Sequence, residues 1–272
     1  MPVMRLDKLI AGAGLCTRSE AKKVIRAGRV TVEGKAVTDP AAHCDSDSDV
    51  RLDGERASWQ EYLYLMMNKP AGYLSVTEDP RAPTVLALLP PELRRRNLSP
   101  AGRLDKDSEG LLLLTSDGDF CHKVISPKSG IEKEYYIEVD RPFPEGAETL
   151  FSAGAVLEDG EVCLPARLVP APDRMSARVF LREGKYHQVK RMSIAAGTKV
   201  KYLKRLSVGG VELDPKLAPG QFRALTEEER RRICEESDNL HKLTNLALSD
   251  REIAQSGQIC YHYPKIQESL EK

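Results

Sequence analysis

The spacing of apolar positions changes along the chain, and the first change marks a small N-terminal module. Between Thr17 and Gly28 the apolar residues share one helical face and basic residues occupy another. Thr17 and Glu20 have the spacing of a capping box, and Gly28 suits the left-handed residue that ends a helix. The alternating segments 29–32 and 35–37 around a Glu-Gly turn predict a β-hairpin. The pattern predicts one amphipathic helix followed by short strands.

A longer stretch of mixed apolar runs follows an expected linker at residues 54–61. Its segments intermix strand and helix patterns without a regular βαβ repeat, which indicates an α+β fold with a mixed, mostly antiparallel sheet. The strand patterns cover 62–67, 110–115, 133–139, 177–181 and 221–225, and the helix patterns cover 84–89, 146–153 and 186–196.

These patterns divide the chain into three parts. Residues 1–58 form the small module, and residues 59–236 form a larger domain. Residues 237–272 form a C-terminal extension with a short helical pattern at 250–253 and no recognisable chemistry. We expect an exposed tail there, with a docked element as the alternative.

The charges of the chain are unevenly distributed. The 41 basic and 41 acidic residues cancel, which taken alone would argue against a nucleic-acid ligand. Residues 1–35, however, carry eight Lys/Arg and three Asp/Glu, and residues 181–206 carry eight and one. Residues 36–60 are acidic by six to two. Two basic segments separated by acidic ones predict local phosphate-binding surfaces.

Composition excludes several other classes of protein. The six cysteines form no Cys-x-x-Cys pair, and His-x-x-x-His spacing is absent, so we expect no metal site. The sequence also has no phosphate-binding or dinucleotide-binding glycine pattern, which argues against a nucleotide cofactor. No segment approaches the roughly 18 apolar residues of a membrane span, and we see no secretory signal. We expect a cytoplasmic monomer without cofactors.

The candidate for chemistry is Asp105. Its tripeptide Arg-Leu-Asp occurs three times, at 5–7, 51–53 and 103–105, and is uninformative alone. Only the third copy is followed by a turn-rich acidic loop and then an unbroken apolar strand. This context predicts a reactive carboxylate on a loop that a buried strand holds rigidly.

Several motifs in order resemble one enzyme family. The segment Gly-Arg-Leu-Asp-x-Asp-x-x-Gly-Leu-Leu-Leu-Leu-Thr-x-Asp-Gly around Asp105 is similar to the catalytic motif of RsuA-like pseudouridine synthases. The other matching motifs are Asn68-Lys69-Pro70-x-Gly72, Lys133-Glu134-Tyr135, 183–192, Leu203-x-Arg205 and 220–225. The first segment, residues 4 to about 52, resembles the S4 RNA-binding domain. That resemblance makes candidate RNA contacts of Arg5, Lys8, Thr17, Arg18, Lys22, Lys23, Arg26 and Arg29.

The resemblance implies roles for residues of the larger domain. Asp105 would act on the ribose of a uridine flipped out of its stack, either by attacking C1′ or by removing a ribose proton. Lys190 is the first choice for a cation that keeps Asp105 ionised, and Arg191 is the second. Tyr135 would stack on the uracil, with an ordinary half-buried strand tyrosine as the alternative.

Three further residues have two interpretations each. Arg103 would fill the space that the base vacates, or would pair with Asp107 or Glu109. Lys69 would support either the RNA backbone or the loop of the active site. His187 has the chemistry of a general base, but a structural histidine is the favoured interpretation.

The resemblance implies ribosomal RNA as the partner, within an assembling small subunit. The spelling Gly184-Lys185-Tyr186-His187-Gln188 favours small-subunit (16S) RNA at a site of the uridine-516 type. A large-subunit (23S) enzyme of the same family and a non-catalytic RNA-binding protein are the alternatives. A nucleobase deaminase would need zinc-ligand spacing that is absent here.

Overall fold

The structure is a computed structural model, and it describes residues 3–57, 59 and 62–235. The C-terminal extension at 237–272, its short helical pattern included, lies outside the described residues. None of the described helices is long and apolar enough to cross a membrane.

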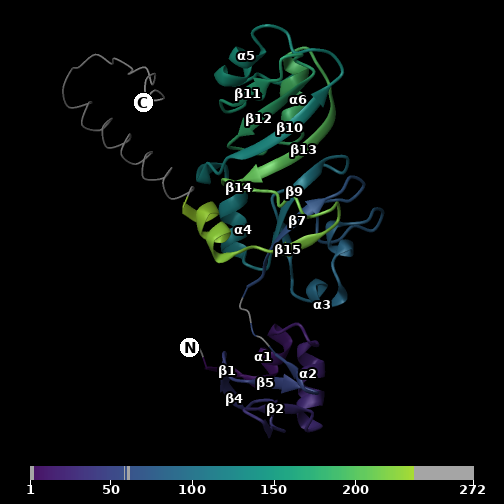
Figure 1. Ribbon diagram of the computed structural model, residues 1–272, viewed down its shortest axis with the longest axis vertical. Coiled ribbons are helices and arrows are strands. Elements are labelled where there is room, and N and C mark those ends of the chain that lie inside the picture. The colour runs from purple at the N-terminus through teal and green to yellow at the C-terminus, as the bar shows by residue number, and fades with distance from the viewer. Residues whose placement is uncertain (1–2, 58, 60–61, 236–272) are drawn as a thin grey trace, which may run out of the picture.

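The N-terminal residues form two short helices against two small sheets (Figure 1). The elements are β1 (Val3–Arg5), α1 (Leu6–Gly12), α2 (Arg18–Arg26), β2 (Val30–Val32), β3 (Lys35–Ala36), β4 (His43–Asp45), β5 (Val50–Leu52) and β6 (Glu55–Arg56). The capping box of α2 is confirmed, because the Glu20 amide donates to the Thr17 hydroxyl and the Glu20 carboxylate accepts from the Thr17 amide. Gly28 has the left-handed backbone expected after the helix. The segment 54–61 is not only a linker, because β6 pairs with β5 inside it.

The larger region is built around a nine-stranded sheet whose main order is β11-β12-β10-β13-β9-β7-β15 (Figure 1). Its strands are β7 (Tyr64–Lys69), β8 (Ser99–Ala101), β9 (Glu109–Thr115), β10 (Lys133–Val139), β11 (Arg167–Pro170), β12 (Ser176–Leu181), β13 (Val200–Val208), β14 (Val211–Glu212) and β15 (Phe222–Ala224). Only the β9–β13 pair is parallel, so the mixed, mostly antiparallel α+β fold is confirmed.

Helices and turns connect the strands. They are η1 (Val85–Leu88), α3 (Pro91–Arg94), α4 (Gly118–Ile125), η2 (Pro127–Ser129), α5 (Ala147–Ala153), α6 (Gln188–Ala195) and a final helical stretch at 227–235. The α-helix expected at 84–89 is a short 3₁₀ turn instead, because Pro90 and Pro91 directly follow and no second turn can form.

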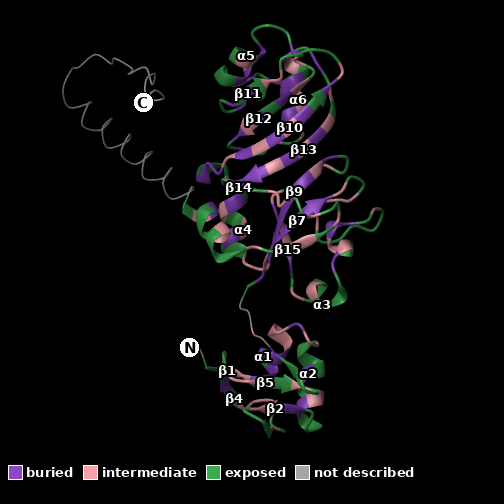
Figure 2. Ribbon diagram, viewed as in Figure 1, coloured by how far each residue is buried: buried purple, intermediate pink, exposed green. Residues whose placement is uncertain are grey.

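Strand β9 explains the run of four leucines. Leu111 and Leu113 pack with α4 on one face of the sheet, while Leu112 and Leu114 pack with η1 on the other. A strand covered on both faces needs apolar residues at every position. Figure 2 shows the buried residues gathered along this sheet, whereas α2 is mostly exposed.

Strand β7 runs two residues further than the pattern indicated. The expected strand at 62–67 and the turn beginning at Asn68 are observed as a strand that continues to Lys69, which pairs with Gly110 of β9. The charged end of Lys69 can enter the core because backbone carbonyls accept hydrogen bonds from its ammonium.

Candidate active site

The loop that carries Asp105 is fixed from beneath by buried polar side chains. The loop connects β8 to β9. The Ser75 hydroxyl donates to the Leu104 carbonyl at 2.9 Å and accepts from the Leu104 amide at 3.2 Å. These bonds fix the residue before Asp105 and therefore restrict where its carboxylate can point.

Lys69 holds the other side of the same loop. Its ammonium donates to the carbonyls of Pro70, Asp105 and Ser108 at 3.0, 3.1 and 2.7 Å. The side chain is fully buried, which lowers the pKa of Lys69 to about 8. Of the two roles considered for Lys69, this geometry fits support of the loop and leaves no exposed ammonium for the RNA backbone.

The Asp105 carboxylate faces two basic side chains from the start of α6. Lys190 Nζ lies 2.9 Å from Oδ2, and His187 Nε2 lies 3.4 Å from Oδ1. Lys190 also donates to Asp107 Oδ1 at 2.6 Å. Burial acts to lower the pKa of Lys190, but hydrogen bonds to Asp107 and Asp105 outweigh it and raise the pKa. Lys190 therefore stays charged beside the Asp105 carboxylate.

His187 has an unusual backbone for a non-glycine residue. It is the N-cap of α6 in the left-handed conformation, with φ of 49°. Its ring stacks on Tyr186 with centroids 3.8 Å apart, and Tyr186 is 68% exposed. The 3.4 Å contact with Asp105 is longer than a well-formed hydrogen bond, so the structure shows proximity and not a firm bond.

Asp105 opens into a cleft of about 630 Å³. Tyr135 of β10 lines it, with only 7% of its surface exposed, together with apolar side chains from β8, α4, β12, α6 and β13 and from the loops. A space of this size with a carboxylate, a charged lysine and an aromatic ring can hold one flat base and its ribose. The structure thus brings together Asp105, Tyr135 and Lys190, which the motifs had singled out separately.

Arg103 and Arg191 differ in their relation to the cleft. Arg103 lines the cleft with an exposed side chain. Its two suggested acidic partners are engaged by other groups, Asp107 by Lys190 and Glu109 by the Tyr202 hydroxyl. Arg191 turns away from Asp105 and pairs with Asp159 and Glu161, so the second-choice cation does not contact the carboxylate.

The basic residues of the N-terminal region fall into two groups. Arg5 and Arg18 both pair with the fully buried Asp7, and Arg29 pairs with Asp53. These three arginines are partly committed to the fold of this region. The other group has exposed side chains and comprises Lys8, Lys22, Lys23 and Arg26.

Sequence patterns did not reveal Arg205 or Ser75 as parts of the site. Arg205 lies in β13, is 1% exposed and lines the same cleft. The motif that contains Arg205 was recognised in the sequence. Its place in the cleft could not be predicted, because it depends on the pairing of β13 with β10, which are far apart in sequence. Ser75 gives no signal of its own, because an isolated serine in a loop is common.

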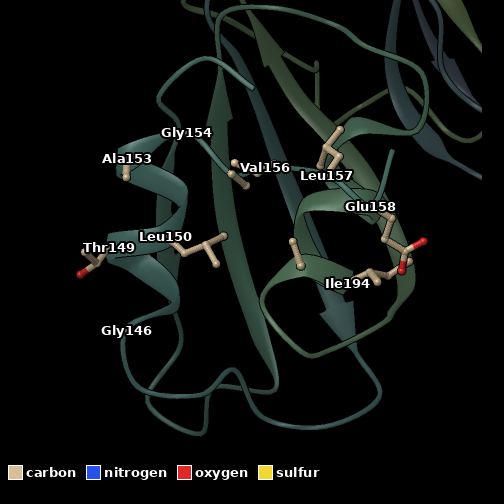
Figure 3. A pocket seen from close by; sticks show the side chains of 11 residues that line it. Gly146, Thr149, Leu150, Ala153, Gly154, Val156, Leu157, Glu158 and Ile194 are labelled. Atoms are coloured by element: carbon tan, nitrogen blue, oxygen red, sulfur yellow. The ribbon is translucent and has the colours of Figure 1, made fainter. Parts of the chain in front are cut away.

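A second cavity, of about 860 Å³, lies between α5 and α6 (Figure 3). Its lining is mainly small and apolar, including Leu150, Val156 and Ile194, and Glu158 is its one ionisable residue. It shares no residue with the cleft at Asp105. Although larger, it has no pair of groups for acid–base or nucleophilic chemistry. Within the described part of the chain, no cluster of three or more His, Cys, Asp or Glu could hold a metal ion.

Comparison with known proteins identifies both regions. The RNA pseudouridylate synthase family matches residues 63–195, and the S4 domain matches residues 4–50. YtzG of Bacillus subtilis (strain 168), named an uncharacterized RNA pseudouridine synthase, is 47% identical over 230 residues, 83% of this chain and 96% of that protein. The ribosomal small subunit pseudouridine synthase A of Escherichia coli (strain K12) is 40% identical over 227 residues, 83% and 98% of the two chains.

A solved structure agrees with the sequence matches. The crystal structure of a pseudouridylate synthase superposes with a TM-score of 0.60 and 36% identity, covering 85% of this chain and 99% of that one. The synthase match includes Asp105, Tyr135 and Lys190, so it covers all three residues that meet in the cleft. The chain therefore belongs to the RNA pseudouridylate synthase family, as an RsuA-like isomerase with an S4 domain ahead of its synthase region.

Proposed function

We propose that this enzyme converts one uridine of small-subunit (16S) ribosomal RNA, of the uridine-516 type, to pseudouridine, with Asp105 as the catalytic carboxylate. The observation that carries the assignment of Asp105 is its 2.9 Å contact with Lys190 at the base of a cleft lined by Tyr135. The small-subunit substrate is supported by the 40% identity to a relative whose name specifies the ribosomal small subunit.

The reaction begins when the target base leaves its stack and enters the cleft. Tyr135 packs against the uracil, and Arg103, exposed at the cleft, fills the space left in the RNA. Unstacking costs a few kcal/mol, and stacking on Tyr135 offsets part of that cost.

Asp105 then acts on the ribose. Either its carboxylate attacks C1′ as the N1–C1′ bond breaks, or it takes a ribose proton to give a glycal. Both routes need the ionised carboxylate that the charged Lys190 favours. The detached uracil turns so that C5 faces C1′. The C5–C1′ bond then forms as the Asp105–C1′ ester bond breaks in the first route, or as the abstracted proton returns to C2′ in the second. Finally C5 loses its proton and N1 gains one.

The proposed division of the molecule follows from this chemistry. Residues 1–58 bind folded RNA through phosphate contacts, residues 59–236 carry out the isomerisation, and 237–272 form an extension. In this proposal the enzyme is a cytoplasmic monomer, and its substrate is ribosomal RNA within an assembling small subunit. The exposed Lys8, Lys22, Lys23 and Arg26 supply the phosphate contacts that position the RNA.

Mapping pseudouridines in both ribosomal RNAs tests the substrate. Carbodiimide treatment and primer extension would compare cells lacking the gene with cells complemented by the wild type or by Asp105→Asn. We expect one site in the small-subunit RNA to be lost and to return only with the wild type. A site lost from the large-subunit RNA would support the paralogous alternative, and no lost site would contradict the ribosomal substrate.

A further inference from the structure

Arg205 is a buried guanidinium with unused hydrogen-bonding capacity. Its Nε donates to the Leu111 carbonyl at 2.7 Å, and Nη1 makes a long 3.4 Å contact with the Arg103 carbonyl. Its Nη2 has no hydrogen-bond partner among the described residues, and no carboxylate in that part of the chain pairs with it. Burying an uncompensated charge is costly, so such a group commonly meets its partner in a ligand.

The register of the sheet places this guanidinium beside the base-binding tyrosine. Tyr135 of β10 and Arg205 of β13 are directly opposite partners, and such partners project from the same face of a sheet. On its other side Arg205 pairs with Gly110 of β9, where an added Cβ would lie 2.2 Å from the Arg205 carbonyl. The glycine therefore permits a close approach of the two strands beneath the Asp105 loop.

The other buried or partly buried cations near Asp105 are already engaged. Lys69 donates to three carbonyls, and Lys190 contacts two carboxylates. Lys133, which is also buried and lines the cleft, donates to the Ile131 carbonyl at 3.1 Å. Among these cations, Arg205 is the one with a buried side-chain nitrogen that lacks a hydrogen-bond partner among the described residues, and its side chain lines the cleft with Asp105 and Tyr135.

Glycosidic cleavage creates the negative charge that such a donor would meet. When N1–C1′ breaks, the bonding electrons stay on the uracil and spread over N1, O2 and O4. The charge persists until C5 bonds to C1′, after which the C5 proton leaves and N1 is protonated. Fixed donors aimed at a developing charge are among the strongest contributions to catalysis.

We propose that Arg205 is a catalytic residue whose guanidinium binds a carbonyl oxygen of the flipped uracil and stabilises the uracil anion after it detaches. This inference rests on the proposed isomerase chemistry at Asp105. It adds a second charge centre, on the base side of the broken bond, to the carboxylate on the ribose side.

Substrates with different leaving groups test this role. Fluorine at C5 withdraws electrons, so the anion of 5-fluorouracil is more stable and its departure needs less help from the enzyme. Single-turnover consumption of uridine and of 5-fluorouridine in the same RNA is compared for wild type, Arg205→Lys and Arg205→Met. We expect Arg205→Met to slow uridine conversion on the order of a hundredfold or more, with at least tenfold less effect on 5-fluorouridine.

Two controls separate chemistry from folding. Arg174 also donates to backbone carbonyls, those of Phe143 and Pro144, and lies outside the cleft lining, so Arg174→Met should affect both substrates equally. If Arg205→Met does not fold, Arg205→Lys replaces it in the test, because lysine keeps the charge but lacks the second donor arm. A larger loss of rate on uridine than on 5-fluorouridine in Arg205→Lys then supports the role of Arg205.

Equal losses on both substrates for Arg205→Lys and Arg205→Met would overturn the role of Arg205 while leaving the isomerase intact. A wild type that consumes neither substrate in any ribosomal RNA would instead overturn the proposed function and this inference together.

Discussion

At the scale of single residues, the site depends on how three positive charges are distributed around one carboxylate. Lys190 contacts Asp105, Lys69 binds the carbonyls of its loop, and Arg205 lines the cleft beside Tyr135. The motifs predicted Asp105 and Lys190 because their spelling is distinctive. The carbonyl contacts of Lys69 could not be predicted, because they depend on where the loop backbone folds over the end of β7.

Replacing Lys190 should remove the positive charge that contacts the Asp105 carboxylate and holds it in place. We expect Lys190→Ala to lower kcat on the order of a hundredfold and Lys190→Arg to retain part of the activity. Arg191→Ala is the matched control on the same helix, since Arg191 pairs with Asp159 and Glu161, and its kcat should fall far less. Similar losses for the two alanine variants, measured as steady-state rates, would contradict the assigned role of Lys190.

The lowered pKa of Lys69 leads us to expect that activity falls at alkaline pH. Burial lowers its pKa to about 8, so the ammonium is charged below that pH and neutral above it. A neutral amine has only two protons for three carbonyls, so the Asp105 loop should loosen and kcat should fall as the pH rises through about 8.

The pH–rate profile of Lys69→Arg checks this limit, because a guanidinium stays charged across the range. Its alkaline limb should move to higher pH even if the larger group lowers the maximum rate. An unchanged limb would show that another group titrates there. Circular dichroism should establish that the variant is folded before its rates are interpreted.

At the scale of elements, the site is held where β9, β13 and β10 lie side by side. The patterns predicted β9 and β10 within a residue at either end, because long apolar or alternating runs give strong signals. They gave no indication of the short strands β1, β4 and β8, nor of the nine-residue β13, in which Lys201, Lys204 and Arg205 interrupt the apolar positions. The parallel pairing of β9 with β13 was also hidden, since no local pattern encodes it.

Gly110 should be the most sensitive glycine of this region. An added Cβ would meet the Arg205 carbonyl at 2.2 Å, and φ is +103°. We expect Gly110→Ala to lower the free energy of unfolding by at least about 3 kcal/mol, from overpacking together with backbone strain. Gly160→Ala is the matched control with φ of +81° and open space around it, and should cost only about 1 kcal/mol. Equal costs in denaturant titrations would contradict the close strand contact.

At the scale of the whole molecule, we propose that a chain of zero net charge binds RNA through local clusters of basic residues. The helix α2 was predictable with its cap, because the capping box and the glycine stop are local signals. The sequence could not show which basic residues of α2 are free to contact RNA. The pairing of Arg18 with Asp7 depends on how α1 packs against α2.

Neutralising the exposed residues of α2 should reduce the salt dependence of RNA binding. We expect Lys22→Gln, Lys23→Gln and Arg26→Gln together to weaken affinity and to lower the slope of log K against log salt by about 2 to 3. Arg51→Gln with Arg56→Gln is the control in the same region, because both arginines pair with Asp49. An unchanged slope in the triple variant would exclude α2 as a phosphate-binding helix.

We propose that Asp105 performs the isomerisation and contributes little to RNA binding. Release of tritium from C5-labelled ribosomal RNA measures the reaction directly, because C5 loses its hydrogen only when the new bond forms. Asp105→Asn keeps the size of the side chain and removes its charge. We predict stoichiometric release by the wild type, none by Asp105→Asn, and RNA affinities within about twofold of each other, because phosphate contacts supply most of the binding. Tritium release by Asp105→Asn at a rate near that of the wild type would show that Asp105 is not the catalytic carboxylate.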